Sequence, residues 1–116
     1  MAQDEKRFPA AFYRSSAGGE PVREWLKALS DDDRRVLGYD IGLVEFGWPI
    51  GMPLCRSLGG GLWEVRSALG RNRIARVIFC AAHGCMVLLH GFIKKSQKTP
   101  KADLDLARRR QNEVQQ

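Results

Sequence analysis

Residues 62–93 decide the fold, and they read LWEVRSALGRNRIARVIFCAAHGCMVLLHGFI. From residue 62 the side chains alternate in character with a period of two, which is typical of a β-strand. A turn at residues 70–72 leads into a longer strand from about Arg73 to Ala81, and a turn at residues 82–84 leads into a third strand over residues 85–93. Because such short connections join neighbouring strands, the stretch predicts a three-stranded antiparallel meander.

The two faces of this meander differ. Alternation along the first strand places Trp63 and Val65 on one face and Arg66 on the other. The third strand, CMVLLHGFI, is apolar at nearly every position, which is typical of a strand covered on both sides. We therefore expect Trp63 and Val65 to pack against helices and Arg66 to lie on an open face of the sheet.

The residues before the meander predict a short strand and a helical hairpin. Residues 7–14 contain aromatic side chains and a proline, which favours an edge strand. Pro21 suits the first turn of a helix with an apolar stripe. Ser30, followed by three aspartates, predicts the N-cap of a second helix that ends at Gly47. Residues 47–61, rich in glycine and proline, are expected to form a loop.

After the meander, Thr99 and Pro100 predict the N-cap and first-turn proline of a terminal helix over about residues 101–114. The expected order is β-α-α-β-β-β-α. Strands grouped after helices indicate an α+β fold, and 116 residues suffice for a single domain over residues 1–116.

The basic side chains are concentrated in the second half of the chain. The formal net charge is +6 at pH 7. Residues 1–61 carry eight basic and nine acidic side chains, whereas residues 62–116 carry eleven basic and four acidic ones. A field of this asymmetry favours a polyanion such as nucleic acid as ligand. A basic protein without such a ligand is the alternative on charge alone.

The sequence also indicates which classes of protein to set aside. It contains no signal-peptide pattern and no apolar run of membrane-spanning length, so we expect a cytosolic protein without a membrane partner. The three cysteines form no CxxC pair and predict no disulfide framework. The glycines at 59–61 lack the Lys-Ser/Thr of a phosphate loop. Cys80, His83 and Cys85 could converge across a hairpin, but we expect no metal site and no cofactor.

A group of basic residues is the strongest candidate for a functional site. Arg76 lies inside the apolar run IARVIF, where a charge needs either a partner or an open face. A salt bridge, for instance with Glu64, is one interpretation, and contact with a phosphate group is the other. If the strands pair as a meander, several cations gather over one region of the sheet and the loop beyond it: Arg66, Arg71, Arg73, Arg76, Lys94, Lys95 and Lys98.

Three segments carry a resemblance to a known family. They are GLWEVR at 61–66, RIARVIF at 73–79 and LLHGFIKKSQKTP at 88–100, of which the last is the most specific. Together with Glu20-Pro21-Val22 and Trp25-Leu26, they resemble the phage-derived branch of the RelE/HigB toxins over about residues 8–112.

The resemblance implies a microbial ribonuclease-like fold and a toxin of a type II toxin–antitoxin system. Its expected activity is ribosome-dependent, metal-independent cleavage of mRNA, in which the ribose 2′-hydroxyl attacks the adjacent phosphorus. Expected partners are a helix-turn-helix antitoxin, the ribosome and mRNA, with operator DNA bound only through the antitoxin complex.

Matched position by position, the resemblance implies that Arg76 stabilises transition-state charge. Arg66, Lys94 and Lys95 would position the phosphate or transfer protons. His90 has a suitable intrinsic pKa and is a further catalytic candidate against a role in the core. RNA contacts are expected from four more residues: Arg71, Arg73, Lys98 and Lys101.

One departure from the family leaves the general base open. RelE uses a tyrosine near its C-terminus, whereas the tyrosines here are Tyr13 and Tyr39, and no histidine follows His90. Two other functions therefore stay open. The protein could be a ParE-like poison of DNA gyrase, or a non-catalytic phage-derived protein that binds an antitoxin and DNA.

Overall fold

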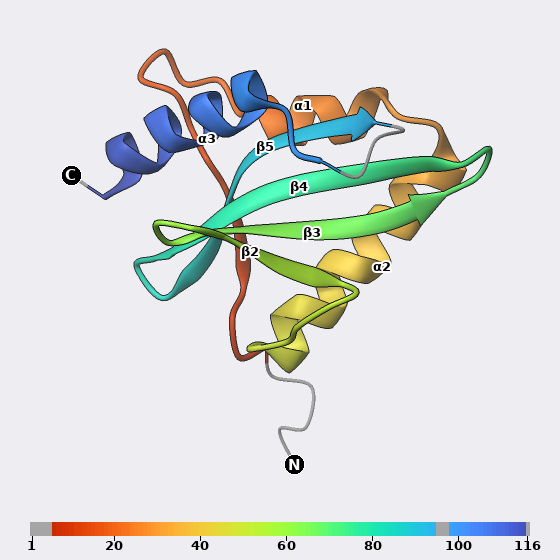
Figure 1. Ribbon diagram of the computed structural model, residues 1–116. Coiled ribbons are helices and arrows are strands. Elements are labelled where there is room, and N and C mark those ends of the chain that lie inside the picture. The colour runs from red at the N-terminus through yellow and green to blue at the C-terminus, as the bar shows by residue number, and fades with distance from the viewer. Residues whose placement is uncertain (1–5, 95–97, 116) are drawn as a thin grey trace.

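The computed structural model describes residues 6–94 and 98–115, which form a mixed α+β fold (Figure 1). The elements follow the order β1-α1-α2-β2-β3-β4-β5-α3. The strands are Ala10–Phe12 (β1), Cys55–Gly59 (β2), Leu62–Leu69 (β3), Arg73–Ala82 (β4) and Cys85–Lys94 (β5). The helices are Pro21–Ala28 (α1), Asp31–Gly47 (α2) and Lys101–Val114 (α3).

The described strands form one sheet in the order β1-β5-β4-β3-β2. The predicted antiparallel meander is confirmed, because β3 pairs with β4 and β4 pairs with β5 in antiparallel orientation. The predicted N-terminal edge strand is also confirmed, and β1 lies parallel to β5. A strand that begins the chain and a strand that ends the meander are thus neighbours in the sheet.

The expectation that residues 47–61 form only a loop is wrong, because they contain β2. This strand pairs with β3, with Cys55 opposite Val65 and Arg56 opposite Glu64. Its local composition is poor for a strand, but without it the outer backbone groups of β3 would have no strand partner at these positions. Tertiary pairing with β3 therefore decides the conformation of a segment whose own residues favour turns.

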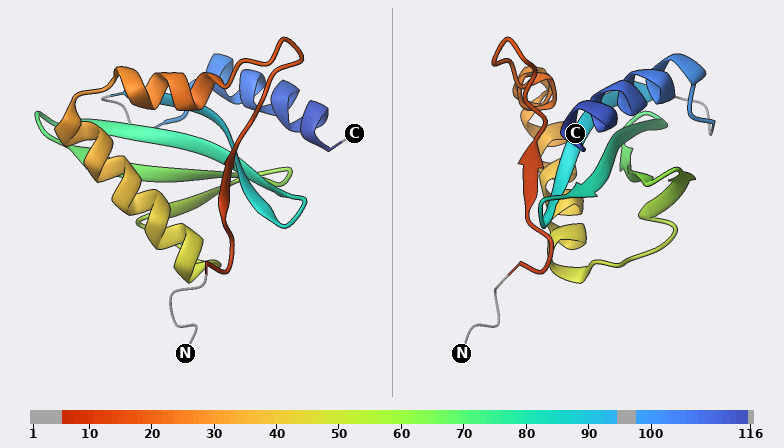
Figure 2. Two further views of the ribbon diagram at one scale, coloured as in Figure 1. Left: turned by 180° about the vertical axis from the view of Figure 1, so that it is seen from behind. Right: turned by 90° about the vertical axis from the view of Figure 1, so that its left-hand side faces the viewer.

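Helices cover both faces of the sheet, as the two views in Figure 2 show. On one face, Val22 of α1 and Leu37 of α2 pack in a core cluster with Val65 and Phe79, and Trp63 packs against this cluster as predicted. On the other face, Ala107 of α3 packs in a second cluster, whose other buried members are Tyr13, Leu62, Ile78, Cys80, Val87, Leu89 and Phe92. The burial of β5 on both sides agrees with its apolar sequence.

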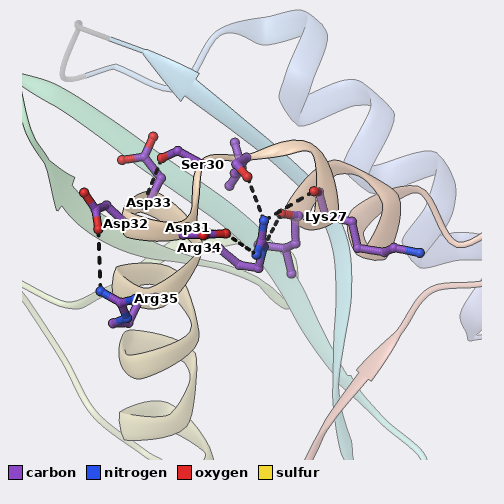
Figure 3. Close-up of polar contacts among 9 residues, drawn as sticks. Lys27, Ser30, Asp31, Asp32, Asp33, Arg34 and Arg35 are labelled. Atoms are coloured by element: carbon purple, nitrogen blue, oxygen red, sulfur yellow. Dashed lines mark hydrogen bonds and ion pairs between the residues drawn. The ribbon is translucent and has the colours of Figure 1, made fainter.

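The junction of α1 and α2 forms as the sequence predicts. Pro21 occupies the first turn of α1, and the Ser30 hydroxyl accepts a hydrogen bond from the Asp33 N–H at 3.2 Å. Arg34 fastens the two helices, because its guanidinium donates to the carbonyl oxygens of Leu26 at 3.1 Å and Leu29 at 2.8 Å (Figure 3). The Leu26 carbonyl also accepts from the N–H of Leu29, the C-cap residue of α1, so Arg34 adds a side-chain link from α2 to this helix end.

The predicted N-cap of α3 is wrong. Pro100 occupies the cap position without a side-chain hydrogen bond, and the Thr99 hydroxyl donates instead to the Glu64 carboxylate at 2.6 Å. A hydroxyl close to a buried carboxylate forms a stronger, charge-assisted bond there than at a helix end exposed to water. Within the described parts of the chain, no helix combines the length and apolar character that a membrane span needs.

Candidate functional site

Strand register brings charged residues together on the sheet face that α3 partly covers. Arg66 of β3 lies directly opposite Arg76 of β4, and Glu64 lies opposite Arg56 of β2. Leu62, two residues before Glu64, packs in the core cluster beneath α3, and side chains two apart on a strand share a face. We refer to Glu64, Arg66, Arg76 and Thr99 as the charged cluster.

The contacts inside the charged cluster are centred on Glu64. Its Oε2 atom lies 3.9 Å from Nη1 of Arg76 and accepts the Thr99 hydrogen bond, and its Oε1 atom lies 3.9 Å from Nε of Arg66. Nη1 of Arg76 also donates to the Thr99 hydroxyl oxygen at 3.3 Å. Glu64 and Arg76 are both fully buried, so the cluster contains an ion pair away from water that a hydroxyl group bridges.

The cluster and its neighbour Arg56 carry more positive than negative charge. Burial lowers the pKa of Arg76, the Glu64 carboxylate raises it, and the cations Arg66 and Arg56 lower it further. A guanidinium group nevertheless stays protonated in proteins. Three guanidinium groups and one carboxylate therefore leave an excess of positive charge, which favours an anion on this face.

A hollow of about 420 Å³ opens beside Arg66. It is lined by side chains from both strands, from α2 and from the segment before β2: Asp40, Pro53, Leu54, Arg66, Ala68 and Ile74. The exposed residue Lys94 lies opposite Ile74 in the register of β4 and β5, so it extends this face at the end of the sheet. A phosphate in the hollow would therefore contact Arg66, which lines it. Lys94 would lie near the phosphate, because it is one strand spacing from Ile74, another lining residue.

Arg76 does not lie on an open surface. Of the two interpretations of its sequence position, pairing with Glu64 is the one that the contacts show. The expectation that the face of Arg66 is open is wrong in part, because Thr99 and α3 cover much of it and the Arg66 side chain is 14% exposed. The Arg76 side chain is fully buried and donates to the Thr99 hydroxyl, so a phosphate could reach its guanidinium only if the residues around it moved.

His90 lies in a different opening. Its Nε2 atom is 2.6 Å from Oδ1 of Asp103 on α3, and its ring stacks on Phe92 with centroids 5.4 Å apart. The groove that it lines lies between α1 and α3 and includes Trp25 and Leu106. None of the residues that the structure describes lines both this groove and the hollow at Arg66. The structure therefore does not bring His90 together with Arg66.

The other predicted RNA-binding residues are dispersed. Both terminal nitrogens of Arg73 donate to the Asp33 carboxylate, at 2.8 and 3.1 Å, so Arg73 ties β4 to α2 on the far face. Arg71 is exposed in the β3–β4 turn, and Lys101 pairs with Asp105 one helical turn away. Lys98 is exposed beside Thr99. Lys95 lies outside the described residues.

Arg56 is a candidate that sequence reasoning missed. It is exposed on β2, opposite Glu64, and its charge acts on Arg76. Because the composition of residues 47–61 predicts a loop, it gives Arg56 no place in the sheet. One signal in the sequence could have found it. The glycine run at 59–61 lies between Arg56 and LWEVR, and a glycine turn between two short segments can indicate a β-hairpin.

Among the described residues, no three histidine, cysteine, aspartate or glutamate side chains form a group that could hold a metal ion. The groups that the charged cluster itself offers are its cations and its buried carboxylate. Such a set can bind an anion, stabilise negative charge that develops on it, and orient the groups around it.

One family model matches most of the chain. The model of the phage-derived protein Gp49-like family (DUF891) matches residues 24–112, a range that contains β2–β5 and every described member of the charged cluster. A search among curated proteins finds no match. Because the family model covers well over half of the chain, the protein belongs to the phage-derived Gp49-like family.

Proposed function

We propose that this protein is the toxin of a type II toxin–antitoxin system and that it cleaves mRNA on the ribosome without a metal ion. The observation that carries the proposal is the convergence of Arg56, Arg66 and Arg76 around one buried carboxylate beside a hollow. Family membership and the RelE/HigB-like segments support it. The proposed partners are a helix-turn-helix antitoxin, the ribosome and mRNA, with operator DNA bound only through the antitoxin.

The proposed chemistry is an internal transfer at phosphorus. The ribose 2′-oxygen attacks the adjacent phosphorus and loses its proton to a base, the bond to the 5′-oxygen breaks, and that oxygen takes up a proton. The products are a 2′,3′-cyclic phosphate and a 5′-hydroxyl end. Negative charge grows on the non-bridging oxygens during this step. We assign its stabilisation to Arg66, which lines the hollow, and to Lys94, which lies opposite the lining residue Ile74.

Arg76 supports this site in one of two ways. In the described conformation it holds Glu64, which in turn lies beside Arg66, and so it positions Arg66 from below. If substrate displaces Thr99, the Arg76 guanidinium becomes available to the phosphate itself. The general base and acid are not assigned, because lysine and arginine are protonated at neutral pH and His90 faces another groove.

The test compares cleavage and growth arrest for two charge-neutralised variants. Arg66→Gln should lower the rate of mRNA cleavage about 100-fold, the usual effect of removing one transition-state donor. Arg23→Gln on α1, with a side chain 56% exposed on the other side of the molecule, should cleave like the parent protein. Primer extension on transcripts after induction measures the cleavage, and purified 70S complexes give the rate.

Two results would overturn the proposal. One is growth arrest with intact transcripts, and inhibition of gyrase in the same cells would then identify a gyrase poison. The other is a protein that binds antitoxin and DNA but neither stops growth nor cleaves RNA. If Arg66→Gln cleaved mRNA at the parent rate, the hollow beside Arg66 would not be the site of cleavage.

A further inference from the structure

The exposed large apolar side chains of the described residues all lie on α2 or just beyond its end. They are Val36, Tyr39, Leu43, Phe46 and Met52. Tyr39 is 67% exposed and Phe46 is 43% exposed. Figure 2 shows α2 crossing the outside of the sheet with no other element over its outer side. A cluster of this kind on a soluble protein marks an interaction surface.

The first four of these residues form a continuous line along the helix, which we call the outer stripe: Val36, Tyr39, Leu43 and Phe46. Their spacing of three, four and three residues is that of a helix–helix seam. The core of the protein uses the other side of α2, where Leu37, Ile41 and Val44 are buried. The outer stripe therefore lies outside the buried core of the single chain.

Glycines beside the outer stripe leave room for a second helix. A hollow of about 510 Å³ is lined by glycine and apolar residues only: Gly38, Tyr39, Gly42, Leu43, Phe46, Gly47 and Ile50. A Cβ atom added at Gly38 or Gly42 would meet nothing within 4 Å, so the space above both residues is open. A large side chain from a partner could lie over them.

We propose that the outer stripe is the interface of a symmetric dimer, in which α2 packs antiparallel against α2 of a second copy of this chain. The spacing of the stripe reads the same in both directions about Ile41. In an antiparallel pair with its two-fold axis at that level, Val36 faces Phe46 of the other copy, and Tyr39 faces Leu43 and lies beside Gly42. Self-complementarity of this kind is what a two-fold interface requires.

The charges of α2 favour the antiparallel arrangement over a parallel one. The helix begins with Asp31, Asp32 and Asp33 and has no basic residue in its last turn. With the two-fold axis at the level of Ile41, antiparallel packing keeps equivalent aspartates of the two acidic ends about 24–30 Å apart, at a rise of about 1.5 Å per residue. It also brings Arg35, which is exposed and pairs with Asp32 (Figure 3), towards the negative end of the other helix.

The outer stripe itself carries no charged side chain that would oppose the contact. Between its first and last residues, Glu45 is buried and paired with Lys6, and Asp40 lines the hollow beside Arg66 instead. A single pair of helices buries less than the roughly 1,200 Å² of strong interfaces, so we expect a dissociation constant in the micromolar range.

Sedimentation of the purified full-length chain between about 10 and 200 μM tests the proposal. The parent protein should pass from monomer to dimer across this range, and Leu43→Asp should raise the dissociation constant at least tenfold. Ser57→Asp, at an exposed position of β2, is the control and should dimerise like the parent. Because both positions are exposed, both variants should fold, and circular dichroism checks this. A parent protein that stays monomeric at 200 μM would overturn the proposal, as would a dimer that survives Leu43→Asp.

Disulfide trapping tests the register. Tyr39→Cys and Leu43→Cys proteins, each with Cys85→Ser, are mixed and oxidised; the remaining cysteines, Cys55 and Cys80, are buried. The proposal predicts mainly a mixed disulfide between positions 39 and 43. A mixture of Tyr39→Cys with Val36→Cys is the control and should not cross-link, since residue 36 faces residue 46. A majority of 39–39 and 43–43 disulfides would show a parallel arrangement and contradict the proposal.

Discussion

The guanidinium of Arg76 lies inside the protein, with the Glu64 carboxylate 3.9 Å away and the Thr99 hydroxyl between them. Both charged side chains are fully buried. Removing one member of such a pair leaves the other charge without compensation in a poor solvent for ions, whereas replacing both members removes the problem. The two charges should therefore be strongly coupled in the free energy of unfolding.

We predict that Arg76→Ala lowers the free energy of unfolding by about 3–5 kcal/mol, the usual cost of breaking a buried ion pair. A double-mutant cycle uses Glu64→Gln, Arg76→Met and the double variant Glu64→Gln/Arg76→Met. The double variant should lose less free energy of unfolding than the two single variants lose in sum. Urea unfolding of the parent, the two single variants and the double variant gives the coupling energy directly. Additive single effects would mean that the pair contributes no net coupling.

This coupling also determines how activity is tested at this site. A loss of toxicity in Arg76→Ala would mix a catalytic effect with a folding defect, so Arg66 is the better position for that experiment. The sequence predicts that Arg76 needs a partner or an open face, and it offers Glu64 as a partner. It cannot predict the hydrogen bond to Thr99, because Thr99 is 23 positions away and has the local signature of a helix cap.

At the scale of elements, one ion pair joins α2 to the sheet. Asp33 lies in the first turn of α2, and its carboxylate accepts two hydrogen bonds from Arg73 of β4. The hydrogen bond from Arg73 is the largest cause that lowers the pKa of Asp33 from its usual 3.8. The folded state thus favours the ionised carboxylate more than the unfolded chain does.

The sign of the pH dependence follows from this shift. A carboxyl group with a lower pKa in the folded state stabilises the fold above its unfolded pKa of about 3.8, and this contribution disappears as the pH falls through the folded pKa. We predict that Asp33→Asn lowers the Tm at pH 7 and that the two Tm values converge below pH 3.8. Thermal unfolding followed by circular dichroism from about pH 2.5 to neutral pH measures both.

Asp32→Asn is the matched control for that prediction. Asp32 is in the same turn of α2, but its side chain is 93% exposed and lies 3.5 Å from Arg35. Exposed ion pairs contribute little, so its Tm should stay within about 1 °C of the parent value at every pH. An equal effect of both substitutions would show that the helix dipole, and not Arg73, is responsible.

Local signals predict most elements, since the period of two in β3–β5, Pro21, Ser30 and Gly47 each act within a few residues. They cannot predict β2, whose conformation depends on pairing with β3. For the same reason, the sequence does not predict that Arg56 belongs to the candidate site. The sequence places Arg73 on its strand and suggests RNA as its ligand, whereas its partner Asp33 is 40 residues away along the chain.

At the scale of the whole molecule, positive charge is distributed unequally between the faces of the protein. The sheet face with Arg56, Arg66 and Lys94 carries exposed or partly exposed cations, whereas α2 begins with three aspartates. Binding to RNA releases counterions in proportion to the number of phosphates neutralised. The salt dependence of binding therefore indicates which face meets the RNA.

We predict that the triple variant Arg56→Gln/Arg66→Gln/Lys94→Gln reduces the slope of log K against log salt by about 2, at roughly 0.7 for each single-strand phosphate that the variant no longer neutralises. Fluorescence anisotropy with a labelled single-stranded RNA between about 50 and 200 mM salt measures the slope. Arg14→Gln/Arg23→Gln/Lys27→Gln removes the same charge from exposed positions near β1 and on α1 and serves as the control. If net charge alone governed binding, both triple variants would reduce the slope equally; a reduction confined to the first places the RNA on the face of the charged cluster.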